Sequence, residues 1–236
     1  MPNAPRRSAF VLGMAMSLPY LLVIIPFGLL FGVLASEAGL GILHALGMSL
    51  TVVAGAAQFA ALQLMVEKAP LALIVLSGLC VNLRMALYSA SLAPFFGSAP
   101  LWQRAAIAYG LTDQTYGTAM QRFVLRPDLS VSERVSFFLG SIVVVCPPWY
   151  GATVAGAAFG GTIPGALALD FAVPITFVAL FAPALRSLPH VAAASVATGT
   201  ALCFAELPFS LWIPVAALAG MLAGAGAEAL LQRAGR

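Results

Sequence analysis

Charged residues are scarce in this chain. They make up 8% of its 236 residues, whereas 61% of the residues are hydrophobic and the mean hydropathy is +1.01. An ordinary soluble domain carries about 25% charged residues, and no stretch of this sequence is both polar enough and long enough to form one. The chain is therefore predicted to be an integral membrane protein that contacts the lipid bilayer along most of its length.

Several signatures of soluble function are also missing. The basic residues are scattered singly between apolar runs, so the net charge of +3 gives no patch for nucleic acid. The three cysteines, Cys80, Cys146 and Cys203, lie in apolar runs without metal-ligand spacing. The motifs of P-loop nucleotide binding, zinc proteases and serine hydrolases do not occur. We therefore expect neither an enzyme nor a resident cofactor or metal.

Apolar runs bounded by charges, proline or glycine follow one another along the chain. A spanning helix needs about 20 apolar residues, so the sequence predicts an all-α bundle of about eight transmembrane segments, some of them broken. The fourth run is the most polar; it either spans with a polar face turned inward or lies along the membrane interface, which leaves seven spans. The runs cover residues 9–35, 43–66, 70–93, 105–123, 135–160, 166–185, 189–205 and 209–231.

The basic residues predict the orientation, because short cytoplasmic loops carry the excess of lysine and arginine. Eight spans with a cytoplasmic N-terminus place nine of the ten basic residues other than Arg84 inside, and only Arg104 outside. The best seven-span arrangement places seven inside. The first run is longer than the ~7–15 apolar residues of a signal peptide, so we expect an uncleaved span and two cytoplasmic termini.

The whole chain, residues 1–236, is predicted to form a single transmembrane domain. Within it, "ALGMSLTVVAGAAQF" is weakly echoed by "ALALDFAVPITFVAL". Transporters are often built from internal repeats, and the echo gives possible repeat halves at about 9–93 and 135–205. Eight spans give the two copies the same orientation and seven invert them, while chance composition explains the echo about as well.

An arginine deep inside the third run is the most informative polar residue. Ionisable residues in spans cost about 2.5–3.5 kcal/mol on insertion scales, and they usually face a cavity or one another. Arg84 stays charged and needs a carboxylate, backbone carbonyls or an anionic ligand as its partner. Tyr88 shares its helical face four residues on, and Asn82 lies beside it. A structural ion pair with Asp113 or Asp170 is the alternative to a ligand site.

The second run is interrupted by Gly55, and Gln58 follows directly. A glycine-interrupted membrane helix can present backbone N–H and C=O groups to a substrate, although small residues equally let helices pack closely. The Gln58 amide needs partners in lipid and favours a functional site. Other glycine pairs with small-x3-small spacing are expected only to pack helices together: Gly28 and Gly32, Gly156 and Gly160, and Gly220 and Gly224.

Four linked motifs follow one another along the chain. They are "GMSLTVVAGAAQFAALQLM", "VNLRMALYSASLAP", "YGLTDQTYG" and "LALDFAVPITFVALFAP". In this order and at these spacings they resemble the AzlC family of branched-chain amino acid permeases, and the match runs from about Pro26 to Pro183. The resemblance implies an exporter of hydrophobic amino acids in a bacterial inner membrane, working with a separate small membrane subunit of the AzlD type.

The polar motif positions of the family are also present here, with one departure. Gln114 stands where family members often carry Glu. If that Glu moves a proton in the relatives, coupling in this chain rests on Asp113 or Asp170, or differs. The matching polar positions are Gln58, Asn82, Arg84, Asp113 and Asp170.

The resemblance and the polar residues together suggest a substrate site. A zwitterionic leucine, isoleucine or valine needs a cationic or N–H-rich site for its carboxylate, an anionic site for its ammonium group, and an apolar pocket. We expect Arg84 and the broken second run to bind the carboxylate, and an aspartate to bind the ammonium group or carry the coupling proton. The predicted substrate-binding residues are Gly55, Gln58, Phe59, Asn82, Arg84 and Tyr88, and the predicted coupling residues are Asp113 and Asp170.

Two other functions stay open at this point. One is a non-catalytic membrane subunit or scaffold whose partner forms the transport path, in which case the buried charges are structural. The other, an intramembrane enzyme, is disfavoured because no nucleophile and base and no metal pair can be read from the sequence. Within the transporter class, methionine, a toxic analogue or another small zwitterion is an alternative substrate.

Overall fold

The computed structural model describes residues 6–160, 185, 187–207 and 212–234, and these residues are almost entirely helical. They fall into two compact units. Unit 1 comprises residues 1–62 and 81–163, and unit 2 comprises residues 63–80 and 164–236.

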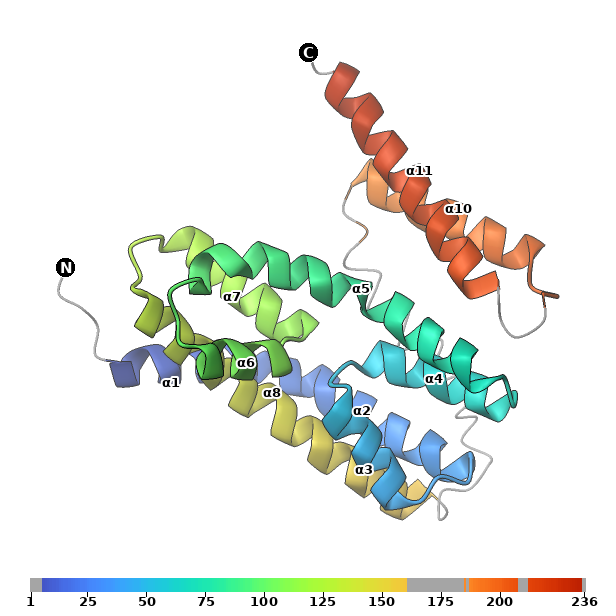
Figure 1. The fold of residues 1–236 in the computed structure, drawn as a ribbon, viewed down its shortest axis with the longest axis horizontal. Helices are drawn as coiled ribbons and strands as arrows, with labels where there is room; N and C mark the ends of the chain where they lie inside the picture. Colours follow the sequence, from blue (N-terminus) through green and yellow to red (C-terminus); the bar gives the residue numbers. More distant parts are fainter. Residues whose placement is uncertain (1–5, 161–184, 186, 208–211, 235–236) are drawn as a thin grey trace. The chain divides into compact units, whose positions relative to one another are not determined.

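The helices are labelled in Figure 1 in chain order. In unit 1 and the segments that leave it, they are α1 (Arg6–Ser17), the 3-10 helix η1 (Leu18–Tyr20), α2 (Leu21–Glu37), α3 (Ile42–Thr51), α4 (Gly55–Val66), α5 (Leu71–Phe96), α6 (Leu101–Tyr109), α7 (Asp113–Leu125) and α8 (Val131–Phe159). In unit 2 they are α10 (Leu188–Cys203) and α11 (Trp212–Ala234).

Four of the described helical segments are long and apolar enough to cross a membrane. The first of them joins α1, η1 and α2 end to end. The protein is thus a polytopic helical membrane protein, as its composition predicts. Residues 166–184 of the sixth predicted run lie outside the described residues, so the predicted repeat halves stay a prediction. The four segments are Ala9–Glu37, Leu71–Phe96, Val131–Phe159 and Val215–Arg233.

The long N-terminal helix and α8 run in the same direction, and glycines let their backbones approach closely. A Cβ at Gly28 would lie 2.9 Å from the Cβ of Ala152, and one at Gly32 would lie 2.6 Å from the backbone nitrogen of Ala157. From the other side, a Cβ at Gly156 would lie 2.8 Å from the backbone of α2. Small residues commonly form the contacts between membrane helices, and the packing role predicted for these glycines is confirmed.

Gly32→Ala is expected to destabilise the protein for this reason. The added methyl group would overlap the backbone of α8, and such overpacking costs roughly 1–3 kcal/mol. Gly47→Ala in α3 is the matched control, because nothing lies within 4 Å of its added Cβ and alanine is the better helix former by about 1 kcal/mol. Thermal unfolding in one detergent compares the variants, and equal unfolding temperatures would show that α2 and α8 do not approach this closely.

The second apolar run is broken at Gly55, as the sequence predicts, and the chain turns back there. α3 leads inward from the end of α2, and the Ser49 hydroxyl on it lies 3.1 Å from the Thr153 hydroxyl of α8. α4 then leads outward beside α2 and in the same direction. A Cβ at Gly55 would lie 3.0 Å from Phe27, whereas the Phe59 ring, one turn later on α4, also reaches Phe31, one turn later on α2. Together α3 and α4 form a helical hairpin whose tip points into unit 1 (Figure 1).

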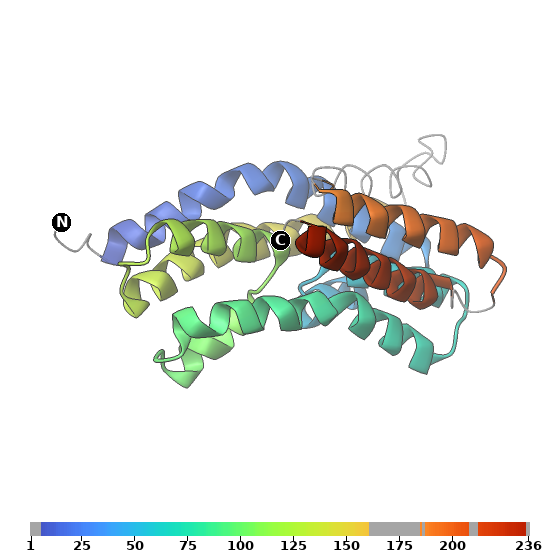
Figure 2. The same ribbon diagram turned by 90° about the horizontal axis from the view of Figure 1, so that it is seen from above.

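The fourth apolar run also forms two helices, which enter unit 1 from the opposite end. α6 runs back along the second half of α5, and α7 then runs outward beside α5 (Figure 2). The Tyr116 ring stacks on Tyr88 at 4.0 Å, and the Phe123 ring lies 5.6 Å from Phe96. The fourth run therefore forms a second helical hairpin, whereas the sequence predicts a span with a polar face or an interfacial segment.

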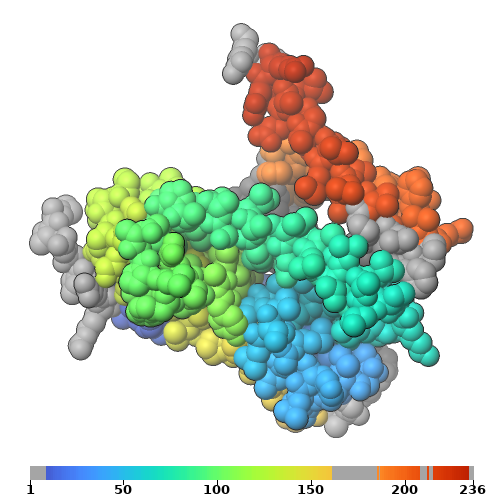
Figure 3. Space-filling model, viewed as in Figure 1, coloured from blue at the N-terminus to red at the C-terminus, as the bar shows by residue number. Residues whose placement is uncertain are grey.

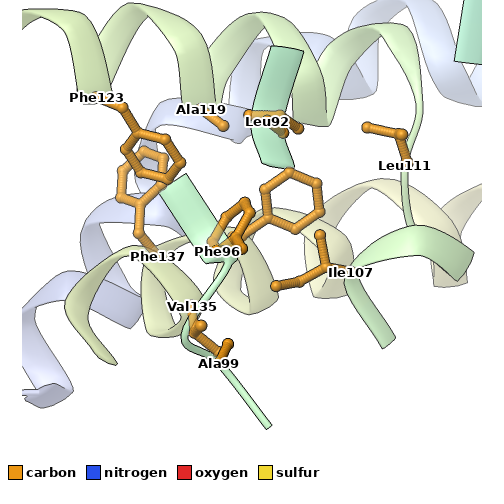
Figure 4. Packing of buried hydrophobic residues seen from close by; sticks show 10 residues of the cluster. Leu92, Phe96, Ala99, Ile107, Leu111, Ala119, Phe123, Val135 and Phe137 are labelled. Atoms are coloured by element: carbon orange, nitrogen blue, oxygen red, sulfur yellow. The ribbon is translucent and has the colours of Figure 1, made fainter. Parts of the chain in front are cut away.

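An aromatic cluster anchors the base of the α6–α7 hairpin. Phe123 is fully buried, and its ring centroid lies 5.6 Å from that of Phe96 on α5 and 6.0 Å from that of Phe137 on α8 (Figure 4). The guanidinium group of Arg134 lies 5.9 Å from the centre of the Phe123 ring and donates to the Pro127 carbonyl at 2.8 Å. These contacts attach the hairpin to both long helices.

The turn between α7 and α8 is fixed by charge. Arg126 Nε and Nη2 each donate to a carboxylate oxygen of Asp128 at 2.8 Å. This hydrogen-bonded pairing lowers the pKa of Asp128 to about 2. Ser130 then starts α8 with a capping box, in which its side chain and that of Glu133 satisfy each other's backbone N–H groups.

Unit 2 contains an antiparallel pair of helices. A Cβ at Gly220 of α11 would lie 2.8 Å from the Cβ of Ala197 of α10, and one at Gly224 would lie 3.0 Å from the Cβ of Ala193. The partner residues move back along α10 as the glycines advance along α11, which fixes the antiparallel direction. The small-x3-small spacing predicted close packing here as well, and this prediction is confirmed.

The two hairpins change which loops share an end of unit 1. The loop before α6 and the loop after α7 lie at the same end, since Phe96, at the start of the first loop, packs on Phe123, near the start of the second (Figures 1 and 2). Eight continuous spans would place these loops on opposite sides of the membrane. The loop that follows α2 lies at the other end, where Gly160 approaches the backbone of Val33.

Cysteine accessibility in intact cells tests this arrangement. In a background without the three native cysteines, Ser98→Cys and Pro127→Cys are expected to react with a membrane-impermeant maleimide from the same side, because both positions are exposed at one end of unit 1. Ala38→Cys, exposed after α2, should react from the opposite side. Labelling of positions 98 and 127 from opposite sides would instead support a continuous fourth span.

Candidate functional site

The tips of the two hairpins are short extended segments in the middle of unit 1. α3 ends at Thr51, Val52 is extended with φ −129° and ψ 91°, and α4 begins at Gly55. α6 ends at Tyr109, Thr112 is extended with φ −133° and ψ 171°, and α7 begins directly afterwards. Each tip places the end of one helix and the start of another inside the protein.

Tyr109 joins the two tips. Its hydroxyl donates to the backbone carbonyl of Leu50 at 2.9 Å and lies 3.0 Å from the hydroxyl of Tyr150 on α8. The last carbonyls of a helix lack intrahelical donors. The next candidate donor for Leu50, the Ala54 amide, bonds to Val52 instead. The last residue of α6 therefore caps the last turn of α3.

Arg84 forms an ion pair with Asp113 at the start of α7. Its Nη1 lies 3.0 Å from Oδ2 of Asp113, and the other carboxylate oxygen, Oδ1, accepts a 3.0 Å hydrogen bond from the Tyr88 hydroxyl. Arg84 and Tyr88 lie four residues apart on one face of α5, as predicted. The Tyr88 ring is in turn held by stacking on Tyr116 at an interplanar angle of 11°.

This ion pair is only partly shielded. The side chain of Arg84 is 25% exposed and that of Asp113 is 31% exposed, so both charges can be reached from outside the packed helices. The Nε of Arg84 is itself buried and has no hydrogen-bond partner among the described residues. The guanidinium group thus retains a donor that the aspartate does not satisfy.

Near the start of α4, three buried polar side chains form a hydrogen-bonded series. Gln58 Nε2 donates to Ser49 Oγ at 3.0 Å, and Ser49 Oγ lies 3.1 Å from Thr153 Oγ1. Gln58 is 1% exposed and the two hydroxyl residues are 0% exposed. Gln58 Oε1 has no partner within the described part of the chain. This hydrogen-bonded series connects α3, α4 and α8 and leaves the amide oxygen of Gln58 without a partner in the described part of the chain.

Aromatic rings surround the same tip. A Cβ at Gly55 would lie 2.9 Å from Trp149 and 3.0 Å from Phe27, so only glycine fits at this start of α4. Phe59 packs on Phe27 and lies 5.6 Å from Phe31. The Trp149 Nε1 is buried without a hydrogen-bond partner among the residues that the structure describes. Gly55 therefore has a packing reason to be glycine, beyond the break that it allows.

The two outgoing helices differ in the charge at their starts. The start of α7 is neutralised, because Thr112 and Thr115 form a capping box and Asp113 places a carboxylate in the first turn. The first turn of α4 has no acidic residue and begins Gly-Ala-Ala, without a side chain that accepts a hydrogen bond. A helix start carries partial positive charge and free N–H groups, so the start of α4 is the more attractive position for an anion.

The predicted site residues fall into two groups. Arg84, Tyr88 and Asp113 come together at the α7 tip, and Gly55, Gln58 and Phe59 come together at the α4 tip. Asn82 lies on α5 two residues from Arg84 and so points to another face. Its Oδ1 is buried without a partner among the described residues. Asp170 lies outside the described residues, and its predicted role stays a prediction.

Sequence reasoning missed the residues that join these groups. Tyr109, Tyr150 and Thr153 carry ordinary hydroxyl groups in apolar runs, and nothing in their spacing marks them as partners of a distant helix end. The available signal was the sequence "YGLTDQT", since Gly110 and the Thr112 capping box stop one helix and start another. Among the described residues, no group of His, Cys, Asp and Glu side chains forms a metal site.

Comparison with known proteins agrees with the motifs. The family described as AzlC protein matches residues 19–163, which include both hairpins and the ion pair. The chain belongs to the AzlC family. An uncharacterized membrane protein of Archaeoglobus fulgidus is 30% identical over 227 residues, which cover 94% of this chain and 97% of that protein.

Other AzlC-like relatives are also membrane proteins. The inner membrane protein YgaZ of Escherichia coli is 29% identical over 227 residues, covering 94% of this chain and 90% of YgaZ. An uncharacterized membrane protein of Helicobacter pylori is 29% identical over 176 residues, covering 74% of this chain and 73% of the relative. No solved structure matches the chain.

The hydroxyl group of Tyr109 is expected to stabilise the tip contact. Tyr109→Phe removes both of its hydrogen bonds, each worth about 1 kcal/mol, whereas Tyr150→Phe removes the contacts with Tyr109 and Cys146 and leaves the Leu50 carbonyl capped. Hydrogen exchange at residues 50–54 should accelerate in Tyr109→Phe and change little in Tyr150→Phe. The same acceleration in both variants would show that Tyr109 does not cap α3.

Proposed function

We propose that this AzlC-family membrane protein is a secondary transporter that exports branched-chain or similar neutral hydrophobic amino acids across the inner membrane. A membrane transport role is consistent with the family. The observation that carries the proposal is the partly exposed ion pair of Arg84 and Asp113 at a hairpin tip. Charged residues inside a membrane protein commonly mark a substrate or ion pathway.

The ion pair offers a zwitterion one partner for each of its charges. The carboxylate of an amino acid would replace Asp113 beside Arg84, and its ammonium group would pair with the released Asp113. One internal pair is exchanged for two pairs with the substrate, so no isolated charge is left in the membrane interior, where it would be costly. The unsatisfied Nε of Arg84 gives the carboxylate a second donor.

The other hairpin tip supplies what the ion pair lacks. The free N–H groups at the start of α4 favour a carboxylate, and the neighbouring Phe59 belongs to an apolar aromatic surface that suits a branched aliphatic side chain. In this proposal Arg84 and the break around Gly55 and Gln58 bind the carboxylate. Asp113 binds the ammonium group or carries the coupling proton, and Asp170 is the second candidate for that role.

Coupling to a proton follows from the bonds of Asp113. Its carboxylate accepts from both Arg84 and Tyr88. Protonation would remove its negative charge, weaken the ion pair and free Arg84 for a substrate carboxylate. The proposal further includes a small AzlD-type membrane subunit as partner and cytoplasmic positions for both termini.

The short distance within the same ion pair also suits a second function, that of a structural membrane subunit. A 3.0 Å pair reinforced by a tyrosine also suits a structural role, in a membrane subunit whose partner forms the transport path. A structural pair tolerates exchange of its charges better than a substrate site does. The double variant Arg84→Asp, Asp113→Arg therefore separates the two functions.

Leucine efflux from proteoliposomes tests the proposal. Vesicles with the protein, with and without its small partner, are loaded with radiolabelled leucine. Arg84→Gln is expected to lower efflux roughly tenfold or more, because a charge-assisted contact to the carboxylate is lost. Arg126→Gln is the matched control, since that arginine pairs with Asp128 in an exposed turn.

Each result has a definite reading at equal amounts of monodisperse protein. Efflux by Arg84→Gln at the wild-type rate would contradict the site, and restored efflux in the charge-exchanged double variant would favour the structural subunit. Absence of leucine efflux in the wild type, even with the partner present, would contradict the proposed substrate.

A further inference from the structure

An apolar groove lies between the second half of α5 and α6, and neither Arg84 nor Asp113 lines it. It encloses about 450 Å³. Its floor is made by the buried side chains of Leu92, Phe96, Ile107 and Leu111. α5 and α6 lie on the face of the protein shown in Figure 3, where they are coloured green. A groove of this size is comparable to pockets that hold small ligands, at about 300–1,000 Å³.

The groove is elongated along the helices. It extends along α5 from Ser89 to Phe96, eight residues or about 12 Å of helix, and on to Gly97 in the following loop. α6 runs antiparallel beside this stretch. The inner end of the groove, in the middle of unit 1, is therefore at Leu111, and its shallow end, at the end of unit 1, is at the loop before α6. Because α5 is long enough to cross the membrane, the groove is aligned with the direction of lipid acyl chains.

One cation lies at the shallow end. Arg104 lines the groove and is exposed. It forms no ion pair with any described residue. Side chains of a helix lean toward its N-terminus, which directs the Arg104 guanidinium group toward the loop before α6. Trp102, 65% exposed in the same turn, is typical of a membrane interface.

We propose that this groove binds an anionic phospholipid, with an acyl chain along the apolar floor and the phosphate at Arg104. The lining contains no carboxylate that would bind an ammonium group, so the groove fits an anionic amphiphile and not a zwitterionic amino acid. Of the other arginines of α7 and α8 at this end, Arg126 pairs with Asp128, Arg134 donates to the Pro127 carbonyl, and Arg122 does not line the groove. Arg104 is thus the groove's own charge for the headgroup.

Native mass spectrometry of the purified full chain tests this proposal with phosphatidylglycerol and phosphatidylcholine as probes. The wild type is expected to retain phosphatidylglycerol in preference to phosphatidylcholine. Arg104→Gln should lower retention of phosphatidylglycerol about five-fold, the effect of one basic residue near an anionic surface. Arg122→Gln, at the same end of unit 1 but outside the groove, should retain the wild-type preference.

The apolar part of the groove is tested separately. Ala108→Phe fills the groove and is expected to reduce retention of both lipids, whereas Ala90→Phe, exposed on α5 outside the groove, should leave retention unchanged. Equal losses in the Arg104 and Arg122 variants, equal retention in the two alanine variants, or a protein dimer that Ala108→Phe dissociates would each overturn the proposal. Thermal unfolding and monodisperse elution confirm that each variant is folded.

Discussion

Every interrupted helix in unit 1 must have its free backbone groups covered by protein, because lipid offers them no hydrogen bonds. α8 packs against the tips of both hairpins. The tip of the α6–α7 hairpin packs on Ile142, where a Cβ at Gly110 would overlap the isoleucine side chain, and the tip of the α3–α4 hairpin packs on Trp149. These two positions are seven residues apart, or about 10 Å of helix. The Tyr109 side chain spans that interval to reach α3.

The meeting of the tips creates a centre whose polar groups are unevenly satisfied. The α7 start has its own carboxylate and capping box, and the α3 end has a tyrosine hydroxyl. The α4 start has neither, and Arg84 and Gln58 each keep one unpaired polar atom within the described part of the chain. Buried polar atoms are normally satisfied, so the unpaired atoms of Arg84 and Gln58 support the proposed binding of a zwitterion at this centre.

The sequence predicted the chemistry of this centre better than its topology. Arg84 needed a carboxylate, backbone carbonyls or an anionic ligand because it cannot lose its charge, and in the structure it pairs with Asp113, one of the two carboxylates named as the alternative to a ligand site. The predicted break of the second run at Gly55 matches the structure. The hairpins were not predicted, because each arm is as apolar as half of a span, and hydropathy does not show whether the chain continues or turns back. Whether the chain continues or turns back after a break depends on contacts such as that of Ser49 with Thr153, and these link residues far apart in sequence.

The two hairpins enter unit 1 from opposite ends, and the charged residues of their loops therefore differ between the two ends. Arg104, Arg122, Arg126 and Arg134 belong to the end from which α6 and α7 enter, whereas Glu37 and His44 belong to the other end. The positive-inside rule predicts that the arginine-rich end is cytoplasmic, and with it Arg104, which the eight-span arrangement placed outside. In the proposed exporter, the hairpin bearing Asp113 enters from the cytoplasmic side and the hairpin bearing the α4 start enters from the outside. Under this proposal, displacement of one hairpin would open the centre to one side only, so movement of a single tip would be enough for alternating access.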